Sequence, residues 1–211
     1  MKKNCKAKVM MWKGDSIMKV LRTGILALAV LFLMIGICYA QSAEECYNKG
    51  IEYGVAGKFE KAQQEFKKAL GVDPFYEEAK VCLELVEDAL EQRIKPETAL
   101  HIFKGVDYGL KGMYDEAIAE YKRAIEINPN YAEAHGNLGV AYAAKGMYDE
   151  AIAEYKRAIG INPNYAEAHN NLAVAYYYKE DYSLAIKHCD ITIELGLRPH
   201  PGFLEALKPY R

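Results

Sequence analysis

The sequence predicts an all-α solenoid in which helical hairpins stack one on another. Three observations lead to this fold class: a near-exact internal repeat, helical spacing of apolar residues within each copy, and helix-ending residues at matching points of the copies. Residues 111–135 and 145–169 are identical except that Glu126 is replaced by Gly160, and the copies lie 34 residues apart. A period of this length is typical of repeat architectures in which each unit packs on its neighbours.

Within one copy, the apolar and small residues follow a helical period, interrupted at two points. Leu138, Ala141 and Tyr142 lie on one face of a first helix, and a second run with the same spacing follows. Gly146 suits a helix end, and Pro163 cannot extend the helix before it. Each unit is therefore expected to be a helical hairpin that buries its apolar face only by stacking.

Small residues and tyrosines occupy the same columns in successive units. The clearest columns are Gly105, Gly139 and Ala173; Tyr108, Tyr142 and Tyr176; Ala117, Ala151 and Ala185; and Tyr121, Tyr155 and Cys189. An earlier copy has Gly50, Tyr53, Ala62, Phe66, Ala69 and Pro74 at the same internal spacing. This pattern resembles the tetratricopeptide repeat (TPR) family, in its exported bacterial form. The resemblance implies a right-handed superhelix of stacked hairpins.

The units follow one another along the chain with one interruption. We predict repeat units at 43–76, 98–131, 132–165 and 166–199. The intervening segment 77–97 has helical periodicity from Glu77 to Gln92, which indicates an extra helix and linker. Residues 200–211 are expected to form a C-terminal capping segment, with the apolar residues Phe203, Leu204 and Leu207 on one face.

Residues 1–40 have the layout of a signal peptide. An apolar run at 25–37 follows Lys19 and Arg22, and small residues lie one and three places before Gln41. As a helix this run would span about 20 Å, less than the roughly 30 Å of a bilayer core. We therefore expect cleavage after Ala40 and a periplasmic or secreted protein. The alternative is an uncleaved inner-membrane anchor through residues 25–40.

The charge of residues 41–211 limits the class of partner. Residues 1–40 carry seven Lys and Arg against one acid, which leaves 20 basic and 28 acidic residues in 41–211. This excess of acidic residues argues against a nucleic-acid partner, which requires a basic face.

Cleavage of the signal peptide would leave three cysteines, Cys46, Cys82 and Cys189. Cys46 and Cys82 could pair, or all three could be small buried residues.

No residue pattern predicts an enzyme. His101, His135 and His169 recur at 34-residue spacing, but equivalent residues of stacked helices lie about 10 Å apart, too far to share a metal ion. We expect them to pack in the core or at its rim. The acidic pairs Asp115-Glu116 and Asp149-Glu150 lie at the start of predicted helices, where negative charge interacts favourably with the helix dipole. We therefore expect no catalytic residue, no metal and no cofactor.

The resemblance implies a binding scaffold that takes a peptide or partner helix in the concave groove lined by the first helix of each unit, with a role in envelope assembly or secretion. The predicted groove residues are Tyr47, Asn48, Ile51, Ile102, Val106, Asn137, Val140, Asn170, Asn171, Val174, Tyr177 and Tyr178. Acids such as Glu133 and Glu167 stand where the family's carboxylate clamp has basic residues. Tyr177 and Tyr178 either contribute to binding or fill space beside the C-terminal helix.

Two other functions remain open. Turns of this kind also resemble the superhelical half of O-linked N-acetylglucosamine transferases, so the protein could be a substrate-docking relative or accessory of such an enzyme. It could also be a structural spacer that forms homodimers through its edge helices.

The leader generates the first prediction. The mature protein is expected to begin at Gln41, because the apolar run is short and the cleavage signal ends at Ala40. N-terminal sequencing and intact mass of the exported fraction test this. A membrane-bound chain that retains residues 25–40 would contradict it.

Overall fold

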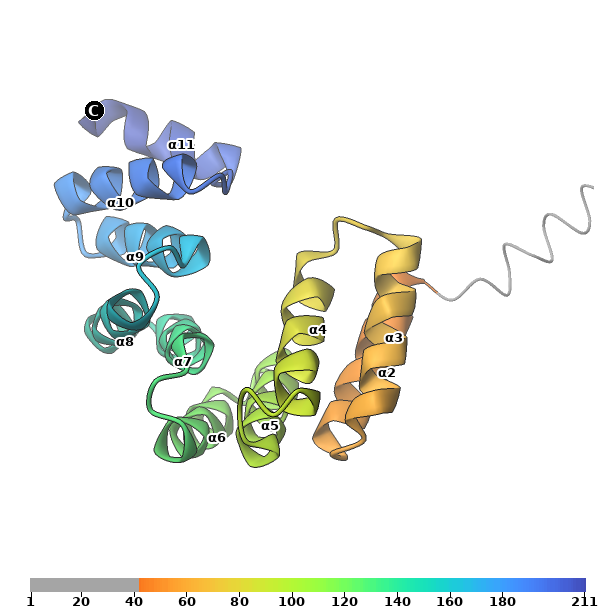
Figure 1. The fold of residues 1–211 in the computed structure, drawn as a ribbon. Coiled ribbons are helices and arrows are strands. Elements are labelled where there is room, and N and C mark those ends of the chain that lie inside the picture. Colours follow the sequence, from red (N-terminus) through yellow and green to blue (C-terminus); the bar gives the residue numbers. More distant parts are fainter. Residues whose placement is uncertain (1–41) are drawn as a thin grey trace, which may run out of the picture. The chain divides into compact units, whose positions relative to one another are not determined.

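The computed structural model describes residues 42–211, and within this range it contains ten α-helices, a C-terminal 3-10 turn and no strand (Figure 1). The all-α solenoid of helical hairpins predicted from the sequence is confirmed. The predicted leader at 1–40 lies outside the described residues. None of the helices within 42–211 is long and apolar enough to cross a bilayer.

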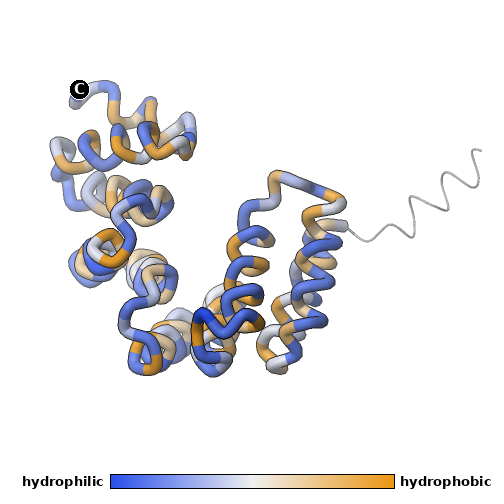
Figure 2. The backbone as a smooth tube through the Cα atoms, in the orientation of Figure 1, coloured by the Kyte–Doolittle hydropathy of each residue, from blue (hydrophilic) through white to orange (hydrophobic). Residues whose placement is uncertain are grey.

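Eight of the helices pair into four hairpins. The hairpins are α2 (Ala43–Val55) with α3 (Phe59–Val72), α5 (Pro96–Leu110) with α6 (Tyr114–Ile127), α7 (Ala132–Ala144) with α8 (Tyr148–Ile161), and α9 (Ala166–Tyr178) with α10 (Tyr182–Glu194). The extra helix expected after the first unit is α4 (Glu77–Leu90), and the chain ends in α11 (Pro201–Leu207) and the turn Lys208–Tyr210. Hydrophobic positions recur along each helix, as its period requires (Figure 2).

The turn inside each hairpin has one residue in the left-handed region. Gly57, Gly112 and Gly146 occupy this position with φ of 68°, 74° and 76°. Glycine accepts this conformation without steric cost and so ends the first helix cleanly. The last hairpin holds Glu180 there instead, with φ of 61°.

The two helices of each hairpin approach most closely where a glycine meets an aromatic ring. A Cβ added at Gly139 would lie 2.5 Å from the Tyr155 ring, and Gly50 with Phe66 and Gly105 with Tyr121 have the same geometry at 2.4 Å. These rings are almost fully buried. In the last hairpin the first position is larger and the second is smaller, because Ala173 replaces the glycine and Cys189 replaces the aromatic residue. Neither residue has exposed surface.

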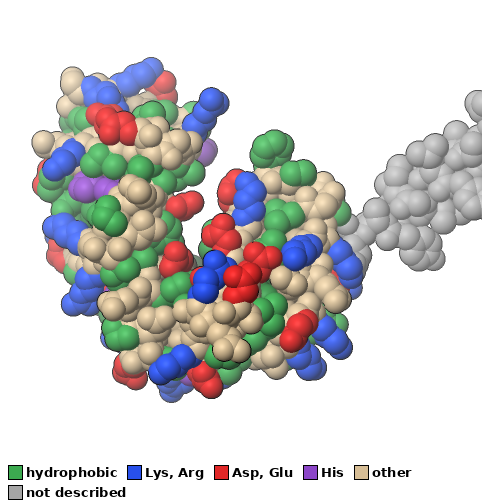
Figure 3. Space-filling model, in the orientation of Figure 1, with side chains coloured by type: hydrophobic (Ala, Val, Ile, Leu, Met, Phe, Trp, Pro, Cys, Tyr) green, Lys and Arg blue, Asp and Glu red, His purple; other side chains and the backbone are tan. Residues whose placement is uncertain are grey.

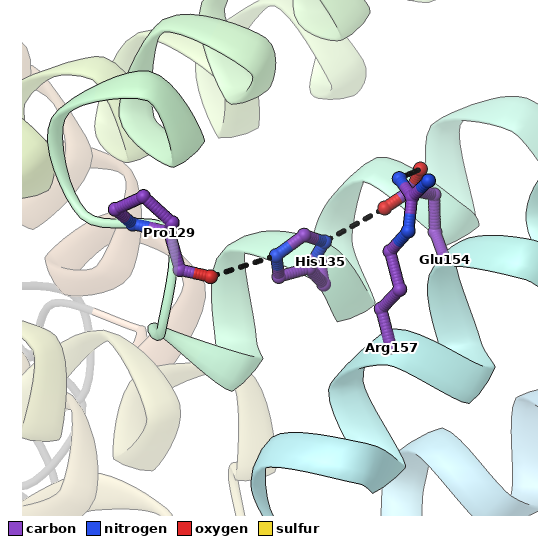
Figure 4. A network of polar contacts seen from close by, with 4 residues as sticks. All are labelled: Pro129, His135, Glu154 and Arg157. Atoms are coloured by element: carbon purple, nitrogen blue, oxygen red, sulfur yellow. Dashed lines mark hydrogen bonds and ion pairs between the residues drawn. The ribbon is translucent and has the colours of Figure 1, made fainter.

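A polar pair crosses the second, third and fourth hairpins beside this contact. His135 Nδ1 lies 2.7 Å from Glu154 Oε2, and His135 Nε2 donates to the carbonyl of Pro129 at 3.1 Å (Figure 4). Arg157 binds the other oxygen of Glu154 at 2.6 Å. The equivalent positions are His101, Glu120 and Arg123 in the second hairpin, and Cys46, Glu65 and Lys68 in the first. The histidines thus pack inside the hairpins while hydrogen-bonding acids of the second helix.

The last hairpin places a second histidine where the others have a glutamate. His188 Nδ1 lies 3.0 Å from His169 Nδ1, and His169 Nε2 donates to the carbonyl of Pro163 at 3.2 Å. Two neutral rings satisfy this arrangement when His188 Nδ1–H donates to His169. Burial, followed by the charges of His169, Lys187 and Lys156, lowers the pKa of His188 to about 4.

The extra helix changes how the first hairpin joins the others. Helix α4 packs on α3, while α5, besides its hairpin partner α6, packs more on α2 than on α4. Phe103 of α5 lies against Gly54 of α2 and also stacks on Phe66 of α3, with ring centroids 6.0 Å apart. The second hairpin therefore packs on α2 of the first hairpin, and α4 lies outside the series of stacked hairpins.

Within residues 42–211, the cysteines form no disulfide with one another. Cys46, Cys82 and Cys189 are all buried, and Cys46 and Cys82 do not form the disulfide that the sequence left open. Burial raises the pKa of the Cys82 thiol to about 12. The structure therefore agrees with the second alternative, in which the three cysteines are small buried residues.

The glycine column generates a prediction. Gly139→Ala is expected to lower the free energy of unfolding by about 1–3 kcal/mol, because its methyl group would overlap the Tyr155 ring. In a Tyr155→Cys background, which reproduces the pair Ala173 and Cys189, the same change should cost at least about 1 kcal/mol less. Urea unfolding of the four proteins measures this coupling. Equal costs in both backgrounds would contradict the size complementarity.

The histidine pair generates a second prediction. The unfolded chain protonates His188 near pH 6.5, whereas the folded chain does so only near pH 4. Protonation of His188 therefore does not lower the free energy of unfolding above about pH 6.5. As the pH drops from 6.5 to 4, the free energy of unfolding falls by about 1–2 kcal/mol for a partly buried ring. Chemical denaturation at several pH values measures the slope.

Two substitutions serve as matched controls. His188→Glu restores the acid found at Glu120 and Glu154, so this variant should gain stability relative to the parent as the pH falls from 7.5 to 5. Glu154→His should introduce the acid-sensitive pair into the third hairpin. Parallel pH profiles for all three proteins would show that the pair does not control acid stability.

Candidate functional site

A cavity of about 500 Å³ lies between α4 and the first helices of the later hairpins. Helix α4 forms one wall, α7 and α9 form the other, and α2 and α5 contribute residues at the base. Figure 3 shows the hollow with acidic side chains on both sides. This is the concave side predicted from the repeats, but here the extra helix closes it into a two-walled site.

The wall supplied by α4 is built by helical spacing. Glu77, Val81, Glu84, Leu85 and Asp88 all line the cavity, and they recur every three or four residues along one face. The opposite face of α4 packs on α3. Burial of that second face fixes which residues point into the hollow.

The cavity combines an apolar base with polar edges. Ile102 is buried and Val106 half-buried at the base, while Val140 of α7 remains 47% exposed. Asn137 and Asn171 occupy equivalent positions of α7 and α9 and bring amide groups to the same hollow. Such a surface can bury an apolar side chain and hydrogen-bond a peptide backbone beside it.

Among residues 42–211, six carboxylates line the cavity and no lysine or arginine does. They are Glu77, Glu78, Glu84, Asp88, Glu133 and Glu167. Burial, together with Asp88, Glu84 and Glu167, raises the pKa of Glu133 against a hydrogen bond from its own backbone. Burial, then Asp88, Glu167 and Glu87, raises the pKa of Glu84, while Arg93 opposes this. Carboxylates from three helices therefore repel one another across the hollow.

Few of these acids have a cationic partner. Arg93 binds Asp88 at 2.8 Å and Lys80 binds Glu77 at 2.6 Å. Within residues 42–211, Glu84, Glu133 and Glu167 form no salt bridge. A single hydrogen bond joins the walls, in which the Tyr131 hydroxyl donates to Asp88 at 3.1 Å. Burial is the main cause that raises the pKa of Tyr131.

Six of the twelve predicted groove residues line this cavity: Tyr47, Ile102, Val106, Asn137, Val140 and Asn171. The other six lie outside its lining. Ile51 is a core residue with 2% exposure, Asn48 is exposed on α2, and Asn170 and Val174 are half-buried on α9. Residues that face the groove and residues that face the core are neighbours on a helix, so the sequence alone does not separate them.

The two C-terminal tyrosines also lie outside the cavity. Tyr177 packs edge-on against Phe203 of α11 and Tyr182 of α10, with centroids 5.8 and 5.6 Å away. Tyr178 is exposed and stacks on Tyr148 at 4.9 Å. For Tyr177 this is the space-filling alternative considered from the sequence.

Sequence reasoning missed the wall formed by α4. It treated residues 77–97 as an extra helix and linker without assigning any groove residue to them, although their acids and apolar residues alternate along one helical face. It also left out Tyr131 and Tyr165, which lie just before α7 and α9 and border the cavity. The exposed acidic stripe of α4 was the available signal. Nothing local could show which surface that stripe would face.

The site offers no arrangement for a metal. Within residues 42–211, no group of three or more His, Cys, Asp or Glu side chains is placed to hold an ion. The carboxylates of the cavity instead extend along its walls, as suits an elongated ligand.

Comparison with solved structures gives the same fold. The Sgt2 TPR domain from Aspergillus fumigatus is 25% identical, with a TM-score of 0.51, over 55% of this chain and 77% of that one. The second TPR domain of human RPAP3, solved with the HSP70 peptide SGPTIEEVD, is 22% identical, with a TM-score of 0.51, over 53% and 95%. The Arabidopsis OM64 TPR domain is 16% identical, with a TM-score of 0.53, over 55% and 97%. No curated protein matches the sequence significantly.

Family models match most of the predicted repeats. A model described as TPR repeat matches residues 107–146 and 141–180, and a model described as Tetratricopeptide repeat matches 43–76. Together these matches cover just over half of the 211 residues. Because the same repeat is found in the sequence, in the hairpin geometry and in the structural neighbours, this chain belongs to the tetratricopeptide repeat family.

Proposed function

We propose that the protein is a non-enzymatic scaffold that binds an extended peptide or a partner helix in the cavity between α4, α7 and α9. The observation that carries the proposal is the cavity's composition. An exposed valine, Val140, and two amides, Asn137 and Asn171, face the same hollow as Val81 and Leu85 of α4. A monomer gains no stability from leaving such a surface open, whereas a ligand can cover it.

The fold supports a polypeptide ligand. Stacked hairpins present an elongated concave surface made from successive first helices. The related domain of human RPAP3 is solved in complex with a peptide, which is a precedent for this fold. In the present chain the repeated asparagines are spaced by one repeat, so they suit backbone groups along a ligand.

The leader supports a site of action outside the cytoplasm. An exported scaffold would meet partners in the cell envelope, so we place its role in envelope assembly or secretion. The expected mature N-terminus at Gln41 is the test of this part of the proposal.

Filling the cavity tests the proposed function. A phage library of random nine-residue peptides is selected on the purified protein, and the enriched peptides are synthesised and measured by fluorescence anisotropy. Val140→Trp is expected to weaken them at least about tenfold, because the indole occupies the hollow at a position that already tolerates exposure.

Leu110→Trp is the matched control, since Leu110 is 60% exposed and lies outside the cavity lining. Circular dichroism and thermal unfolding verify that both variants fold. Enriched peptides that bind the parent and Val140→Trp equally would contradict binding in this cavity.

A further inference from the structure

The unusual feature of the cavity is its charge. Of the residues that the structure describes, six carboxylates and no basic side chain line it. The HSP70 peptide bound by the human RPAP3 domain, SGPTIEEVD, carries two glutamates and one aspartate. A ligand of that kind would bring more negative charge into an acidic hollow. This cavity therefore suits the opposite ligand charge.

We infer that the cavity takes a cationic polypeptide segment, in which lysine or arginine side chains lie beside an apolar residue. This inference rests on the proposed function, because it specifies the ligand of the same site. The lysine and arginine heads would meet Glu84, Glu133 and Glu167, and the apolar residue would cover Val140. Both walls are acidic, so a segment lying between them is attracted from two sides.

Four carboxylates of the cavity, Glu78 among them, form no salt bridge within residues 42–211, and three of the four lie on separate helices. Glu84, Glu133 and Glu167 come from α4, α7 and α9, and none of them forms a salt bridge within residues 42–211. Arg93 forms a salt bridge with Asp88, and Lys80 forms one with Glu77, so those two acids already have a cationic partner. Exposed acids such as Asp149 and Glu205 have a lysine partner, whereas these three share one hollow without one.

The mutual repulsion of these acids is a cost to the free protein. The pKa of Glu84 and of Glu133 is raised by burial and by the neighbouring acids of α4, α7 and α9. A group whose folded pKa is raised loses stabilisation as the pH rises, so ionisation of this cluster at neutral pH opposes folding. A cationic ligand removes that repulsion. Residues kept at the expense of stability are expected at functional sites.

Other charged partners fit less well. A second copy of the folded body is disfavoured because residues 41–211 carry 28 acids against 20 basic residues. A nucleic acid is disfavoured by the same sign. The apolar base, formed by Ile102, Val106 and Leu85, distinguishes a peptide with apolar side chains from a small polyamine.

The peptide selection described above tests the ligand charge. The enriched peptides whose binding depends on Val140 are expected to carry at least two Lys or Arg and one apolar residue. Their affinity should fall at least about tenfold in the variant Glu84→Gln, Glu133→Gln, Glu167→Gln. It should also fall when salt is raised from 0.1 M to 1 M, which shortens the Debye length from about 10 Å to about 3 Å.

A second triple variant controls for net charge. Glu52→Gln, Glu126→Gln and Glu194→Gln remove the same number of acids at exposed positions outside the cavity, and this protein should bind the peptides like the parent. Thermal unfolding provides an independent readout. The cavity variant should be more stable than the parent while binding more weakly, a combination that a purely structural role for these acids would not give.

The outcomes separate the inference from the proposed function. Neutral or acidic peptides that bind in a Val140-dependent way would overturn the cationic ligand and leave the peptide-binding scaffold intact. Equal loss of affinity in both triple variants would show a non-specific charge effect and also overturn the inference. Peptides that are insensitive to Val140→Trp would overturn both.

Discussion

The structure depends on one close contact, repeated in each hairpin, between a small residue of the first helix and the residue that faces it on the second. Gly139 admits the Tyr155 ring, which then fills the space between the helices. The contact brings the helices together and decides which face of each is buried. Where the ring is lost, at Cys189, the partner gains a methyl group as Ala173. The volume of the pair is thus partly conserved while the residues change.

Because this contact uses one face of the first helices, another face stays open on the concave side. Val140 and Asn137 lie on that face. In a regular series of hairpins the concave side would be a shallow surface. Here α4 interrupts the series, packs on α3 and presents its acidic stripe across the hollow from α7 and α9. The irregular helix is therefore what converts a repeated surface into a site with two walls.

Glutamates serve two purposes in the same hairpins. Glu154 is buried against His135 and Arg157, so its charge is matched inside the protein. Glu133, on the other side of the first helix, faces further carboxylates. The first arrangement satisfies a buried charge, as stability requires. The second leaves like charges together where a ligand can reach them, and this contrast is the basis for assigning a cationic partner to the cavity.

The sequence by itself determined the hairpins, because the 34-residue period and the helix-ending residues act locally and repeat. It also predicted six of the nineteen residues that line the cavity, including Val140 and Asn171, because repeats place equivalent positions on one surface. Only the tertiary structure placed Glu84 and Asp88 opposite them. The position of α4 depends on how it packs on α3 and on how Phe103 of α5 packs against α2 and α3, and such long-range contacts have no signature in a local pattern.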